Sequence, residues 1–109
     1  MSMYVDLLSR ALVGRVEELT GDDLVGYALV CRAKMLAAGA YNGASAYAAL
    51  ATEVAYDRSL LKLCAAHDID VVVADFAQPT EERRRIEQML VAAGLDLAVL
   101  ARRRGYGEA

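Results

Sequence analysis

Proline is scarce in this sequence: Pro79 is the single proline among 109 residues, where an average composition would supply about five. Tryptophan is absent, and phenylalanine and histidine occur once each, as Phe76 and His67. Proline breaks the interior of a helix but fits its first turn, and Pro79 stands directly before Thr80-Glu81-Glu82. The scarcity therefore favours a mostly helical chain with one strongly marked helix start.

Cysteine and lysine are also few. Cys31 and Cys64 are far apart in the chain, which excludes a disulfide framework, and we expect two free thiols in a cytoplasmic protein. The N-terminus lacks the basic and apolar regions of a signal peptide. The weakly polar stretch 36–51 is too short and too rich in alanine to span a membrane. Many alanines and arginines beside two lysines indicate the codon bias of a GC-rich, bacterial genome.

Helical periodicity is what the sequence has in plenty. Apolar residues recur at spacings of three and four over about 5–19, 22–38, 44–66 and 79–93, the pattern of helices with one buried face. We expect Gly39 to close the second helix and His67-Asp68 to end the third. Gly94 should cap or bend the fourth helix, and the pattern continues to about residue 103.

These segments predict an all-α fold, a compact bundle of four main helices plus a short C-terminal helix. We expect one domain over residues 1–104 and a frayed tail over 105–109. The alanine-rich third helix should lie at the centre of the bundle, because small side chains let neighbouring helices approach closely. Thr20 resembles the start of a capping box for the second helix.

The connector at about 69–78 is ambiguous. Its run of β-branched residues reads locally as a strand, but the chain offers no other segment to pair with it. We predict an extended or short-helical connector that places Ile69, Val72 and Phe76 in the core. An intermolecular strand pair is the alternative.

A single histidine limits the catalytic options. Cys64 and His67 lie one turn apart, and Asp68 or Asp70 could join them, but zinc needs three or four ligands and nothing in the spacing demands that arrangement. The apolar flank of Cys64 makes its thiol inert. We predict no metal and no cofactor, and we assign no catalytic residue.

Carboxylates and tyrosines supply the candidates for ligand binding. Glu53 and Asp57 are spaced i,i+4 on the third helix, where paired carboxylates could serve acid–base chemistry. An ordinary solvated flank, or an ion pair with Arg32 or Arg15, is the alternative. Tyrosines around the same helix could line a pocket between helices. The candidate ligand-binding residues are Tyr41, Tyr47, Glu53, Tyr56, Asp57 and His67.

Arginines form two triplets, at 83–85 and 102–104. We interpret the first as a surface laced with ion pairs, Glu81 with Arg85 and Arg83 with Glu87, at i,i+4 spacing. The net charge of −3 and pI of about 5.1 argue against a general attraction to nucleic acid or an anionic membrane. The candidate nucleic-acid contacts are Arg102, Arg103 and Arg104.

Three functions follow from these observations. The first is a non-enzymatic protein-interaction module that forms a homodimer or docks on another protein, because the hydrophobic content of 57 % exceeds what a small core needs. The second is a small-ligand-binding or enzymatic bundle that uses the tyrosines and carboxylates between helices. The third is nucleic-acid binding through the C-terminal arginines.

Overall fold

Residues 2–13, 22–40 and 46–106 are described by a computed structural model. Over these residues the chain forms five α-helices and one short 3₁₀ helix, and no strand. The elements are α1 (Met3–Val13), α2 (Asp22–Ala40), α3 (Ala46–Ala66), the 3₁₀ helix η1 (Val73–Ala77), α4 (Pro79–Ala92) and α5 (Leu97–Arg104). The all-α prediction is confirmed. Thr20 and Tyr41 lie outside the described residues.

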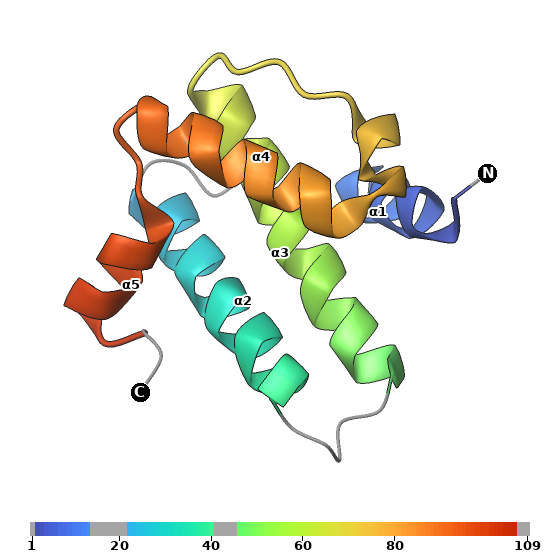
Figure 1. Ribbon diagram of the computed structural model, residues 1–109, viewed down its shortest axis with the longest axis horizontal. Helices are drawn as coiled ribbons and strands as arrows, with labels where there is room; N and C mark the ends of the chain where they lie inside the picture. The colour runs from blue at the N-terminus through green and yellow to red at the C-terminus, as the bar shows by residue number, and fades with distance from the viewer. Residues whose placement is uncertain (1, 14–21, 41–45, 107–109) are drawn as a thin grey trace.

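The central helix is α3. It packs against α1, α2 and α4, while α5 packs against α2. Figure 1 shows α2 and α3 side by side, with α4 across α3 and α5 beside α2. None of the described helices is long and apolar enough to cross a membrane.

Burial is uneven along α3. Its second half supplies the buried residues, while Ala46, Ala48 and Ala51 in its first half are exposed. The expected close approach of a neighbour to the alanine-rich half is therefore wrong at these positions. Instead, this half of α3 forms one wall of a groove, described below.

The hydrophobic core is assembled from all five α-helices and η1, together with Leu95. Phe76 of η1 is fully buried and stacks near Tyr4 of α1, with ring centroids 6.4 Å apart. A radius of gyration of 13.3 Å is that of a compact domain of this length. The buried hydrophobic residues are Tyr4, Leu8, Leu24, Ala28, Leu29, Cys31, Tyr56, Leu60, Leu63, Cys64, Phe76, Ile86, Leu90, Leu95, Leu97 and Ala101.

Three helices end in the same way, with a residue in the left-handed conformation and a backbone hydrogen bond that spans five residues. After α3, Asp68 has φ 57° and Ile69 N–H donates to Cys64 O at 2.8 Å. After α4, Gly94 has φ 94° and Leu95 N–H donates to Leu90 O. Gly105 repeats this pattern after α5, with φ 80°. Such an end satisfies carbonyls that the helix leaves unpaired.

The predicted boundaries can now be compared with these ends. Pro79 lies in the first turn of α4, and His67-Asp68 follow the end of α3, as the sequence predicts. Gly94 caps α4 rather than bending it. Gly39 does not close α2, because the helix continues to Ala40.

The connector between α3 and α4 combines both expected forms. Residues 69–72 have no regular secondary structure and 73–77 form η1. Phe76 is buried and Ile69 is half-buried, but Val72 is exposed. The prediction that Val72 enters the core is wrong, because Val72 precedes η1 as an extended residue while Phe76 lies within it.

Two glycine-to-alanine substitutions should have opposite effects on stability. Gly94→Ala forces a side chain into a left-handed backbone, so the free energy of unfolding should fall by about 1 kcal/mol. Gly26→Ala meets open space inside α2 and should raise it by roughly 0.5–1 kcal/mol. Urea unfolding followed by circular dichroism measures both. Equal effects of the two substitutions would contradict the assigned helix end.

Candidate functional site

Asp57 lies at the centre of a buried charge network between α1, α3 and α4. Its side chain is fully buried and faces Arg83 of α4, whose Nε donates to Oδ1 at 2.7 Å and whose Nη2 donates to Oδ2 at 2.8 Å. Such a two-point contact between guanidinium and carboxylate is strong and directional. The pair thus fixes how α4 lies on α3.

Two further side chains complete this network. The Tyr4 hydroxyl donates to Asp57 Oδ2, which connects α1 to the pair. Arg83 Nη2 also donates to Glu53 Oε2 at 3.1 Å. The predicted pairing of Arg83 with Glu87 is wrong, because Arg83 points to α3 and takes both candidate carboxylates. Pairing of Asp57 with Arg32 is wrong for the same reason, and Arg15 lies outside the described residues.

Burial and the neighbouring groups act in opposite directions on the pKa values of Asp57 and Arg83. Burial raises the pKa of Asp57, while the hydrogen bonds from Arg83 and Tyr4 lower it. Burial and the Asp57 carboxylate raise the pKa of Tyr4, so the phenol stays protonated. Burial lowers the pKa of Arg83, but the hydrogen bonds and charges of Asp57 and Tyr4 together outweigh it and raise that pKa. Both Asp57 oxygens are engaged and the side chain is fully buried, so Asp57 holds helices together and presents no free base to a substrate.

Tyr56 forms a second link between α3 and α4. The residue is fully buried, and its hydroxyl donates to Glu87 Oε2. Burial and the Glu87 carboxylate raise the pKa of Tyr56. The predicted pair of Glu81 and Arg85 is not formed; Arg85 instead donates to both oxygens of Glu82, each at 2.6 Å. Tyr56 is thus a core residue of the bundle.

The remaining candidate residues are dispersed. Tyr47 is 84 % exposed at the start of α3. His67 is exposed beyond the other end of the same helix. The three C-terminal arginines, Arg102–Arg104, are exposed in the last turn of α5, where positive charge offsets the helix dipole. The five candidate ligand-binding residues that the structure describes therefore do not converge on one pocket.

Potential metal ligands do not gather in the described residues. Cys64 is buried and His67 is exposed, and no group of three or more histidine, cysteine, aspartate or glutamate side chains comes together there. Burial raises the pKa of both Cys31 and Cys64. A raised pKa keeps a thiol protonated and unreactive.

An apolar groove runs between α1 and the first half of α3. It encloses about 290 Å³, near the lower end of the range for small-molecule sites. Six of its eight lining residues are alanine, valine or leucine. The groove is lined by Leu7, Ala11, Tyr47, Leu50, Ala51, Val54, Ala55 and Arg58.

Arg58 is the unusual residue of this groove. Only 7 % of it is exposed, and its Nε and Nη2 atoms are enclosed without a hydrogen-bond partner in the structure. Its positive charge lowers the pKa of Tyr27 and Cys31 on α2, against the stronger effect of burial. Sequence reasoning missed Arg58, although it stands four residues after Val54 and three before Leu61 on an apolar helical face.

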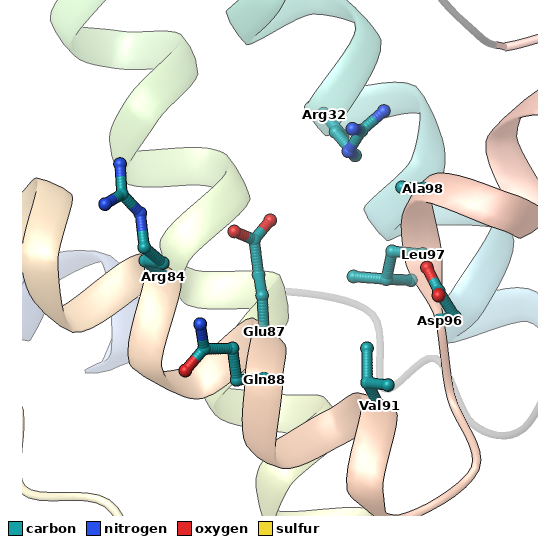
Figure 2. A pocket seen from close by; sticks show the side chains of 8 residues that line it. All are labelled: Arg32, Arg84, Glu87, Gln88, Val91, Asp96, Leu97 and Ala98. Carbon is teal, nitrogen blue, oxygen red and sulfur yellow. The ribbon is translucent and has the colours of Figure 1, made fainter.

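A second, more polar cleft lies between α2, α4 and α5. Figure 2 shows Arg32 of α2 opposite residues of α4 and α5, with the Glu87 carboxylate between Arg84 and Arg32 in this view. Glu87 already accepts from Tyr56, and Asp96 Oδ1 accepts from Val99 N–H at the start of α5. The two carboxylates of this cleft are thus already hydrogen-bonded within the fold. The groove between α1 and α3 is therefore the better candidate site.

Removing the cation of the buried network should be costly. In Arg83→Met, Asp57 is buried without its cation, and the free energy of unfolding at pH 7 should fall by about 3–5 kcal/mol. Losing the pairing raises the pKa of Asp57 further above its unfolded value. The folded variant then binds a proton that the unfolded chain releases, so its stability falls as pH rises through that interval. Urea unfolding at several pH values measures this.

Matched variants separate this effect from general damage to α4. Arg84→Met removes an exposed arginine next in the chain, and should change stability by less than about 0.5 kcal/mol. Adding Asp57→Asn to Arg83→Met should remove the new pH dependence. Equal losses in Arg83→Met and Arg84→Met would show that the pair is not what holds α4.

Comparison with known proteins finds no relative. No protein-family model matches the chain, and no curated protein or solved structure matches it.

Proposed function

We propose that this chain is a non-enzymatic binding protein whose groove between α1 and α3 holds a small ligand with an apolar body. The observation that carries the proposal is the groove itself, open to the surface and walled by Leu7, Leu50 and Val54. Apolar pockets that keep a few polar groups are the usual form of a small-molecule site.

The arrangement of ionisable groups supports binding over catalysis. Asp57 and Glu53, the paired carboxylates of α3, are held by Arg83. Tyr4 and Tyr56 each donate to a carboxylate and have raised pKa values. A general base needs an oxygen or nitrogen within reach of its substrate, and each of these groups already forms a hydrogen bond within the protein.

A neutral probe tests the groove without involving charge. Octan-1-ol should bind the wild-type protein saturably and shift the amide NMR signals of Leu7, Leu50 and Val54. Ala51→Phe places a ring at an exposed groove position and should weaken binding at least tenfold, the scale of about two lost methylene contacts. The matched control, Ala92→Phe on exposed α4 surface, should leave binding unchanged. Signal shifts that never saturate, or that map to the cleft at Arg32, would sink the proposal.

Docking of a second protein chain is another candidate for the same region. Met3, one helical turn before Leu7 on α1, is 71 % exposed, and Tyr47 stands exposed at the groove. Exposed apolar residues beside a groove are typical of a helix-docking surface.

The oligomeric state distinguishes docking of a second copy from a ligand site alone. If two copies dock through this face, light scattering should give about twice the chain mass of 11.7 kDa. Met3→Gln and Tyr47→Gln together should return the mass to that of one chain, because both replace exposed apolar surface on this face. A monomer in concentrated wild-type solution would contradict self-docking.

A further inference from the structure

The positive charge of Arg58 is not answered by any described side chain. Its Nε and Nη2 atoms are enclosed without a hydrogen-bond partner, only 7 % of the residue is exposed, and the residue lines the groove. Buried guanidinium groups in folded proteins are normally paired with a carboxylate or hydrogen-bonded by carbonyls. A buried guanidinium group without a partner is therefore unusual, and a bound anion would supply the partner.

The neighbouring carboxylates are committed elsewhere. Asp57 precedes Arg58 in the chain, but successive helical residues lie about 100° apart around the axis, and Asp57 faces Arg83 and Tyr4. Glu53 is also bonded to Arg83. On its own side, Arg58 has Tyr27 and Cys31 of α2 close enough for its charge to lower their pKa values. Both stay neutral, since burial raises their pKa values more strongly.

From these contacts we infer that the groove takes an aliphatic monocarboxylate, with the carboxylate on Arg58 and the hydrocarbon chain along α1 and α3. This inference rests on the proposed function of the groove and names its ligand class. A guanidinium matches the fork of a carboxylate and holds it by two parallel hydrogen bonds. Leu7, Leu50 and Val54 offer the chain an apolar wall.

The charge count of the groove favours a carboxylate over a phosphate group. Arg58 is the one cationic side chain among its eight lining residues. A phosphate monoester near neutral pH carries between one and two negative charges, so a single arginine would leave part of that charge unanswered. A monocarboxylate brings one charge and an unbroken apolar body, which is what the groove offers.

The experiment compares octanoate with octan-1-ol, which have chains of equal length and differ at the head group. Titrations of the whole chain followed by NMR should show octanoate binding at least tenfold more tightly. Affinity should also rise about fourfold with each added methylene from butanoate until the groove is filled.

Arg58→Met tests the head group directly, since methionine keeps much of the side chain's apolar volume. The preference for octanoate over octan-1-ol should fall to about one, while the urea midpoint should rise because an unpaired buried charge is gone. Arg102→Met, at an exposed position of α5, is the matched control and should keep the preference. Arg58→Lys should keep part of it, because a cation remains without the two-pronged geometry.

The failures of the two proposals are distinguishable. If octan-1-ol binds the groove and octanoate gains nothing over it, the inference is overturned and the proposed function stands. If neither compound binds, both are overturned. A large fall of the urea midpoint in Arg58→Met would also overturn the inference, because it would show that Arg58 already has a structural partner. The wild-type comparison decides the matter without any variant.

Discussion

The ion pair of Asp57 and Arg83 is the constraint on which the arrangement of helices depends. Removing two charges from water is expensive, and the cost is recovered only when the geometry is good and the remaining lone pairs are hydrogen-bonded. Two donor atoms of Arg83 meet the two Asp57 oxygens, and the Tyr4 hydroxyl completes the carboxylate. Satisfying this one carboxylate therefore places α1 and α4 on α3 together.

Because Asp57 pairs with Arg83, it does not pair with its neighbour in the chain, Arg58. Asp57 and Arg58 are adjacent residues of opposite charge, yet helix geometry directs them to different sides of α3. Asp57 is paired within the protein, whereas the enclosed Nε and Nη2 of Arg58 have no hydrogen-bond partner in the part of the chain that the structure describes. Stability alone would favour an apolar residue at position 58. We therefore propose that the uncompensated charge in this apolar groove serves to bind an anion.

Local signals were sufficient to predict most of the fold but not its interior contacts. Pro79 predicts the start of α4, and His67-Asp68 the end of α3, because helix ends depend on residues next to them in the chain. The prediction that Gly39 closes α2 fails, because a glycine inside a helix and a glycine just beyond its end cannot be distinguished in the sequence. The predicted burial of Val72 fails as well, because the direction of its side chain depends on where η1 begins.

The sites show where sequence reasoning stops. The sequence favours pairing Arg83 with Glu87 because partners one turn away are visible in sequence, whereas Asp57 lies 26 residues earlier and meets Arg83 only through packing. Arg58 carried a readable signal, a charge on the apolar face between Val54 and Leu61. Our central proposal is that the Arg58 guanidinium binds the carboxylate of a ligand in the groove. A crystal structure of the protein with octanoate tests this proposal most directly. The account predicts the carboxylate on the Arg58 guanidinium with the chain between α1 and α3. An empty groove, or octanoate bound at Arg32 and Arg84 instead, would contradict it.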